Sequence, residues 1–231
     1  MKVALVRFPG ANCEQDGFHA LNDDLGITAE YVWHAQGSLD GYDAVFLPGG
    51  FTYGDYLRCG AIAARANIMS EVIRFANEGR PVFGPCNGFQ VLCEAGLLPG
   101  ALMQNESERF RCENVLLKAV NRSSPWTRNA DQIVSIPIAH GEGRYVCDDD
   151  TLKMIHDLNL VAFQYVNASG ELSEDANPNG SIENIAGLVN KRGNVLGMMP
   201  HPERATKNRF DAFCRVWSGL PLRLWVANRN S

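Results

Sequence analysis

Short apolar runs alternate with helix-length segments through the first half of the chain. This order predicts a parallel sheet flanked by helices, because parallel neighbours need a long crossover connection. The pattern favours strands at 2–8, 29–33, 43–47 and 81–83, and helices at 13–25, 61–77 and 87–95. Asn12, with Gln15 three residues later, fits a capping box for the first helix, and Gly26 ends it.

The second half is richer in strands. Apolar runs predict strands at 115–119, 132–138, 161–166, 185–189 and 195–199, and a final helix at 209–217. The segment 167–184 is rich in Asn, Gly, Ser and Glu, which is typical of an exposed loop. Such a loop is either functional or a tolerated surface insertion. No segment has the composition of a linker, so we expect a single domain over 1–231.

Composition narrows the class of protein. With 231 residues, 45% of them hydrophobic, the chain can bury a core without metal or disulfide support. The net charge of −5 gives no general attraction to nucleic acid or to anionic membranes. The apolar run 3–6 is too short for a signal peptide, and no run reaches the roughly 18 residues of a membrane helix. We therefore expect a cytoplasmic protein.

Seven cysteines are scattered without CxxC spacing: Cys13, Cys59, Cys86, Cys93, Cys112, Cys147 and Cys214. The odd number and the spacing argue against a disulfide framework and against a zinc site. Most free cysteines are small buried hydrophobes, so a catalytic role for any one of them must be argued from its neighbours.

Cys86 has such neighbours. The predicted strand at 81–83 leads through Gly84, Cys86 and Gly88 into a helix, which is the cysteine form of a nucleophile elbow. The turn would present the thiol at the carboxyl edge of the sheet and at a helix N-terminus, where a thiolate is favoured. The Asn87 N–H could then face an oxyanion. The alternative is a buried cysteine on a glycine-rich turn.

Two further patterns could complete a site. Gly49 and Gly50 follow the strand at 43–47, and the Gly50 N–H could supply a second oxyanion donor; the alternative is an ordinary tight turn. Near the end, Pro202 biases His201 towards extended geometry, which puts His201 and Glu203 on one face. An imidazole oriented by a carboxylate can take the proton of a thiol. The alternative is a solvated loop with a chance ion pair.

The other histidines have weaker contexts. His140 stands in a glycine-spaced polar turn after a strand, where it either lines the pocket or serves the turn. His156 lies on a segment expected to be helical and exposed. His19 and His34 have no flanking glycines or prolines of this kind.

Together these motifs resemble the class I, triad-type glutamine amidotransferases. Longer blocks resemble one family within that class, the small glutaminase subunits of phosphoribosylformylglycinamidine synthase. The blocks are VRFPGANC at 6–13, LPGGFTYGDYLRCG at 47–60, CNGFQ at 86–90, AHGEG at 139–143 and GMMPHPER at 197–204. The resemblance covers nearly the whole chain.

The resemblance implies a flavodoxin-like three-layer α/β/α sandwich with a mostly parallel central sheet. It makes Cys86 the nucleophile, His201 the base and Glu203 the residue that orients it. Glutamine would form a γ-glutamyl thioester on Cys86 and leave as glutamate and ammonia.

Further residues match the substrate side of the family's site. Gly50, next to Gly49, and Asn87 match the oxyanion positions, and Gln90 matches a glutamine contact. Pro85 departs from the usual small or aliphatic residue, but it only precedes the oxyanion donor, so we expect activity to survive.

The resemblance also implies partners. Ammonia would pass to a separate synthetase subunit that binds ATP and Mg²⁺ and converts formylglycinamide ribonucleotide, in purine biosynthesis, with a third small subunit bridging the two. This chain itself would bind no metal or cofactor. The polar loops and the segment 51–60 are candidate docking surfaces.

Two rival functions share much of this pattern. A glutaminase or other hydrolase of another pathway would have the same elbow and triad and would differ in its partner. A redox-sensing protein of the same fold would need a reactive, accessible thiol but no Pro-His-Pro-Glu element, so that element counts against it.

Overall fold

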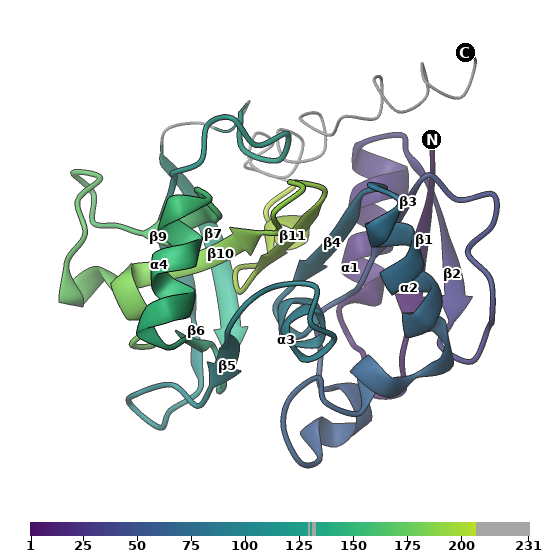
Figure 1. The fold of residues 1–231 in the computed structure, drawn as a ribbon, viewed down its shortest axis with the longest axis horizontal. Coiled ribbons are helices and arrows are strands. Elements are labelled where there is room, and N and C mark those ends of the chain that lie inside the picture. Colours follow the sequence, from purple (N-terminus) through teal and green to yellow (C-terminus); the bar gives the residue numbers. More distant parts are fainter. Residues whose placement is uncertain (129, 131–132, 207–231) are drawn as a thin grey trace.

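The computed structural model of the chain describes residues 1–128, 130 and 133–206 (Figure 1). The predicted helix at 209–217, Cys214 and the first residue of the predicted strand at 132–138 lie outside the described residues. Among the helices of the described part, none has both the length and the apolarity to cross a membrane.

One large sheet organises the chain. Its strand order is β2-β1-β3-β4-β11-β10-β9-β6-β7, and a small second sheet pairs β5 with β8. The strands are β1 (Lys2–Arg7), β2 (Thr28–Trp33), β3 (Ala44–Phe46), β4 (Val82–Pro85), β5 (Ala101–Met103), β6 (Arg111–Ala119), β7 (Ile133–His140), β8 (Arg144–Val146), β9 (Val161–Tyr165), β10 (Ile185–Val189) and β11 (Val195–Met198).

The sheet has two halves that differ in direction. The pairings from β2 to β11 are parallel, and those from β11 to β7 are antiparallel. Figure 1 shows β11 between the two halves. The parallel half has the crossover helices that the strand–helix alternation predicts, whereas the antiparallel half is built around the long β6–β7 pair.

Alternation along β1 explains the three layers. Ala4 and Val6 belong to the core under α2 and α3, whereas Val3 and Leu5 belong to the core under α1, because successive side chains of a strand point to opposite faces. The helices are α1 (Glu14–His19, continued by a π-helical turn, Ala20–Asp24), α2 (Asn67–Asn77), α3 (Asn87–Glu94) and α4 (Asp149–Asp157). Figure 1 shows α2 and α4 on the same face of the sheet. The flavodoxin-like α/β/α architecture is confirmed.

Two local predictions are wrong. The helix expected at 61–77 is split, because Ala66 is extended (ψ 151°) between a 3-10 turn, Ala63–Arg65, and α2. Asn12 does not cap α1, whose N-cap is Cys13 with no side-chain cap bond. The Asn12 Oδ1 instead accepts from the Cys13 thiol at 3.2 Å.

The turn from β4 into α3 packs tightly against the end of β3. A Cβ on Gly84 would lie 2.7 Å from backbone atoms of Gly88, and a Cβ on Gly88 would overlap the carbonyl oxygen of Leu47. Both positions therefore need glycine for reasons of space, as the elbow pattern predicts.

We expect Gly88→Ala to lower the free energy of unfolding by about 1–3 kcal/mol, because the new methyl must displace backbone. Gly37→Ala is the matched control, since its Cβ would have no atom of the described residues within 4 Å, and we expect it to change stability by less than about 0.5 kcal/mol. Urea unfolding of both variants measures the difference. Equal stabilities would contradict this account of the elbow.

Candidate active site

A strained residue joins β4 to α3. Cys86 has φ 49° and ψ −113° and stands at the N-cap of α3, a conformation that non-glycine residues adopt rarely and at a cost of about 1–3 kcal/mol. Its N–H donates to the Met198 carbonyl at 2.7 Å, and its own carbonyl accepts from Phe89 N–H at 2.9 Å. The thiol is thus held at the carboxyl edge of the sheet, as the elbow pattern predicts.

His201 and Glu203 arrive at the same edge. They follow β11, which lies parallel to β4 and next to it. His201 Nδ1 lies 2.7 Å from Glu203 Oε1, and both side chains are buried. The shared face predicted from Pro202 is therefore present, and the alternative of a solvated loop is wrong.

The charge of His201 depends on its two neighbours. Burial alone would lower its pKa, but the charges of Cys86 and Glu203 outweigh burial and raise the pKa of His201 to about 10. Among the described residues, His201 Nε2 has no hydrogen-bond partner of ordinary geometry. His201 is therefore cationic at neutral pH.

Gly49 packs against both Cys86 and the imidazole of His201. A Cβ there would lie 2.8 Å from His201 Cε1, 3.2 Å from Cys13 Sγ and 3.3 Å from Cys86 Cβ. Gly50 has φ 138°, and its Cβ would lie 2.7 Å from Asn12 N. The two glycines thus let the backbone pass close to Cys86, which an ordinary tight turn does not require.

Asn87 and Gln90 tie three segments together. Asn87 Oδ1 accepts from Thr52 N–H at 3.3 Å, and its Nδ2 donates to Gln90 Oε1 at 2.8 Å. Gln90 Nε2 in turn donates to the Glu142 carbonyl at 2.6 Å. The network links the segment that follows Gly49 and Gly50 to α3 and to the turn after β7. The side chains of Asn87 and Gln90 therefore fix these three segments relative to one another.

His140 is buried at the end of β7 with a defined tautomer. Asn105 Nδ2 donates to the carbonyls of Arg109 and His140, which turns its Oδ1 towards His140 Nδ1 at 3.1 Å and Gly143 N at 2.9 Å. Because Oδ1 only accepts, Nδ1 carries the proton and Nε2 carries a lone pair. Burial, together with the charge of His201, lowers the pKa of His140 to about 4. Nε2 has no hydrogen-bond partner within the described part.

These residues surround a small cleft of about 140 Å³, which we call the Cys86 cleft. It is lined by Gly50, Phe51, Asp55, Cys59, Cys86, Gln90, Phe110, Ala139, His140, Gly141 and Glu142. His201 and Cys13 line a neighbouring hollow of about 160 Å³ that also reaches Cys86. The sequence prediction that His140 lines a pocket is therefore correct, and its bond to Asn105 also serves the turn.

The sequence interpretation missed several residues of this region. Burial raises the pKa of the Cys13 and Cys59 thiols, which keeps both protonated. Cys13 also accepts from Arg204 Nη2 at 3.2 Å. In the sequence, Cys13 is the last residue of the block at 6–13 and Cys59 the last but one of the block at 47–60.

The loop 167–184 reaches back to the turn after β7. Asn179 and Ser181 are buried, and Asn179 Nδ2 donates to the Gly143 carbonyl at 2.8 Å. Part of this loop, expected to be exposed, therefore supports the turn that follows His140.

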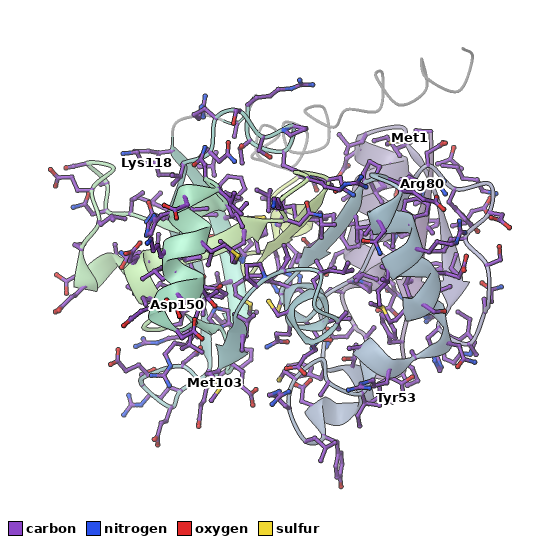
Figure 2. All side chains as sticks on the ribbon, in the orientation of Figure 1. Met1, Tyr53, Arg80, Met103, Lys118 and Asp150 are labelled. Carbon is purple, nitrogen blue, oxygen red and sulfur yellow. The ribbon has the colours of Figure 1, made fainter. Side chains whose placement is uncertain are left out.

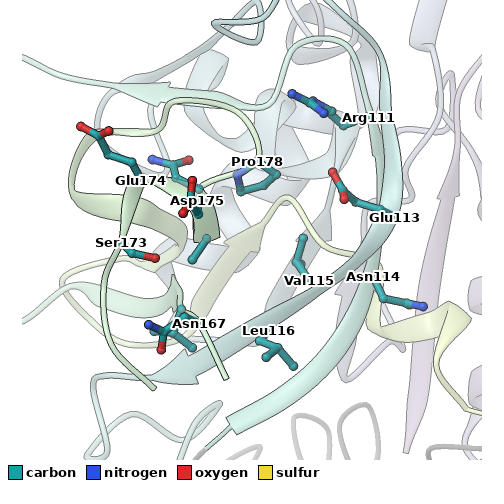
Figure 3. A pocket seen from close by; sticks show the side chains of 13 residues that line it. Arg111, Glu113, Asn114, Val115, Leu116, Asn167, Ser173, Glu174, Asp175 and Pro178 are labelled. Atoms are coloured by element: carbon teal, nitrogen blue, oxygen red, sulfur yellow. The ribbon is translucent and has the colours of Figure 1, made fainter. Parts of the chain in front are cut away.

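A wider hollow of about 550 Å³ lies between β6 and the 167–178 segment (Figure 3). Figure 3 shows Arg111 and Glu113 on one side of it and Glu174 and Asp175 on the other. Its described lining contains neither Cys nor His. Its polar described lining is made of Arg, Ser, Asn, Asp and Glu, whereas the elbow thiol and the two imidazoles line the Cys86 cleft and the hollow next to it.

A family model for the CobB/CobQ-like glutamine amidotransferase domain matches residues 1–219. The chain belongs to this glutamine amidotransferase family. Its strand-to-helix elbow and its His–Glu pair lie within the matched region. The glutamine amidotransferase resemblance drawn from the sequence is confirmed.

Solved structures agree with this assignment. The amidotransferase is 40% identical to a chain in the structure of PurLQS from Thermotoga maritima, with a TM-score of 0.79 over 100% of this chain and 99% of that one. It also matches a glutamine amidotransferase from Thermotoga maritima at 14% identity and a TM-score of 0.58, over 97% and 92% of the two chains. The second match shows the fold alone.

The described part of the amidotransferase has no group of three or more His, Cys, Asp or Glu side chains placed to hold a metal ion. Its six described cysteines are free thiols.

We expect His201 of the amidotransferase to stay protonated up to pH 9 and to titrate near pH 10. Cys86→Ser or Glu203→Gln should lower this pKa, because each removes a charge that opposes the effect of burial. NMR titration of ¹³Cε1-labelled histidines measures it, and His140, neutral down to about pH 5, is the internal contrast. A neutral His201 at pH 8 in the unaltered protein would contradict the prediction.

Proposed function

We propose that this chain hydrolyses L-glutamine to glutamate and ammonia through a thioester on Cys86. The observation that supports it best is the meeting of a strained elbow thiol with a buried His201–Glu203 pair whose imidazole is cationic. Membership of a glutamine amidotransferase family gives the substrate class.

In the first half-reaction the Cys86 thiolate attacks the side-chain amide carbon of glutamine. The oxyanion is held by the backbone N–H groups of Gly50 and Asn87, each worth about 2.7–4 kcal/mol of barrier. His201 then donates its proton to the departing nitrogen, and ammonia leaves as the thioester forms. Proton transfer of this kind contributes about 10²–10⁴-fold to the rate.

In the second half-reaction water attacks the thioester carbon. The neutral His201 takes one proton from the water, glutamate leaves, and the thiolate–imidazolium pair is restored. Glu203 keeps Nδ1 protonated throughout, so that Nε2 is always the nitrogen that exchanges the proton. Phe51 and Phe110 offer apolar surface for the methylene groups of glutamine, next to Gln90 and His140.

The likeness to a chain of PurLQS supports a more specific role. We place this chain as the glutaminase subunit of phosphoribosylformylglycinamidine synthase, in the cytoplasm. Its ammonia would pass to a synthetase subunit that uses ATP and Mg²⁺ to convert formylglycinamide ribonucleotide to formylglycinamidine ribonucleotide, with a small bridging subunit between them. The 40% identity over both full lengths carries this proposal.

A partner also fits the surface beside the cleft. Tyr56 and Leu57 are 75% and 91% exposed, and Tyr53, Asp55 and Leu57 have positive φ angles. We propose that this segment docks the synthetase subunit and that docking raises the glutaminase rate, since a glutaminase that works alone wastes ammonia.

Cys86 should be the site of a glutamine-protected reaction. An electrophilic glutamine analogue should form one adduct, located on Cys86 by peptide mass spectrometry, and excess glutamine should suppress it. Cys86→Ser should lose the adduct, whereas Cys112→Ser, which removes an exposed thiol, should keep it. An adduct on another residue, or one that excess glutamine does not suppress, would contradict the proposal.

The pathway is tested separately. The purified chain, mixed with the synthetase and small subunits, should support ATP-dependent amidation of formylglycinamide ribonucleotide with glutamine as the nitrogen source, and its glutaminase rate should rise on mixing. Glutaminase activity without any such amidation would leave the triad chemistry standing and assign the chain to another pathway. Equal rates for the isolated and the mixed chain would contradict activation by the partner.

A further inference from the structure

The Cys86 cleft has an acidic wall. Asp55 and Glu142 both line it, and the Cys59 thiol lies against both carboxyl groups. Asp55 Oδ1 is buried and has no hydrogen-bond partner within the described part. None of the described residues that line the cleft is Lys or Arg. The wall therefore carries negative charge that no side chain of the cleft compensates.

A second, independent acceptor points to the same kind of ligand. His140 is 3% exposed and lines the cleft, and its Nε2 lone pair is unpartnered. A buried acceptor without a hydrogen-bond partner destabilises the structure by about 1–3 kcal/mol. A ligand with hydrogen-bond donors is therefore favoured here. Two carboxylates and one neutral imidazole together fit a cationic donor group.

We propose that Asp55 and Glu142 bind the α-ammonium group of the substrate and so make the site selective for an amino acid over a simple carboxamide. This proposal rests on glutamine as the substrate and adds the groups that recognise its amino-acid end. With the carboxamide at Cys86 and the methylene groups against Phe51, the ammonium meets the acidic wall, while the same wall repels the α-carboxylate and thereby orients the substrate.

The segment that carries Asp55 is anchored two residues earlier, at Tyr53. Tyr53 N–H donates to the Pro9 carbonyl at 2.7 Å, and its hydroxyl lies 2.9 Å from His34 Nδ1. Burial raises the pKa of Asp55; the hydrogen bond from Cys59 opposes this, and the charge of Glu142 adds to it. A bound ammonium would relieve the cost of keeping this carboxylate charged.

Asp55→Asn is the decisive variant. Asp55 has φ 54°, and Asn is among the few residues that tolerate this region, so the loop should keep its shape while the charge is lost. The rate of Cys86 alkylation is measured on the full chain with two reagents. 6-Diazo-5-oxo-L-norleucine carries the α-amino acid group, and iodoacetamide does not, so the ratio of the two rates isolates recognition of that group.

We expect Asp55→Asn to lower this ratio about 10- to 100-fold, the range for a lost hydrogen bond between charged groups, and Glu142→Gln to lower it as well. Protection by 4-carbamoylbutanoate, which lacks the amino group, should be the same in the variants as in the unaltered chain. Asp150→Asn, a surface carboxylate on α4 that Figure 2 shows across the molecule from Tyr53, is the matched control and should keep the ratio.

Other outcomes distinguish failure of the ammonium site from failure of the proposed glutaminase function. A ratio within about twofold of the unaltered chain in both variants overturns the ammonium site, and so does an equal fall in both alkylation rates, because Asp55 would then act on the thiol or the fold. If the unaltered chain shows no preference for the amino-acid reagent and no protection by glutamine, the proposed glutaminase function itself is wrong.

Discussion

The parallel pairing of β4 with β11 is the contact on which the site depends. In this register Pro85 lies opposite Met198, and Cys86 N–H donates to the Met198 carbonyl at 2.7 Å. The chain therefore enters the elbow from one strand and the Pro-His-Pro-Glu segment from its neighbour, at the same edge. Because a shift of one residue reverses every side chain of a strand, this register alone brings a thiol and an imidazole together from positions far apart in the sequence.

The triad carries its charges at a cost to stability. His201 and Glu203 are both nearly inaccessible to solvent, and a buried ion pair rarely repays its desolvation. The backbone of Cys86 is strained. The glycines around it lose more conformational entropy on folding than other residues do, which lowers stability further. The buried pair, the strained backbone and the glycines together hold a protonated His201 next to the sulfur of Cys86. The large apolar cores on both faces of the sheet, which hold Phe46, Phe75 and Phe83, compensate for them.

The sequence predicted the parts of the site whose geometry is local. Gly84 and Gly88 specify the elbow by the space they leave, and Pro202 specifies the direction of His201, so residue spacing is enough for both. Asn105 could not be predicted in this way, because it meets His140 only through the fold, 35 residues away. The predicted cap at Asn12 is wrong for a similar reason. Ala11 pairs with Gly50, and the Oδ1 of Asn12 accepts a hydrogen bond from the Cys13 thiol instead of capping the helix.

The positive group of the site and its hydrogen-bond acceptors lie on or after different strands of the sheet. The cation His201 follows β11 and faces the sulfur. The acceptors are Asp55 from the segment after β3, His140 at the end of β7 and Glu142 from the turn that follows it. In the proposed mechanism the oxyanion donors are backbone N–H groups, and Gly49 and Gly50 let the chain pass close enough to Cys86 to supply one of them. A lysine in the Cys86 cleft would neutralise the acidic wall and compete for the thiolate. If the acidic wall binds the α-ammonium group as proposed, a described lining without Lys or Arg leaves it free to attract that group and to repel the α-carboxylate.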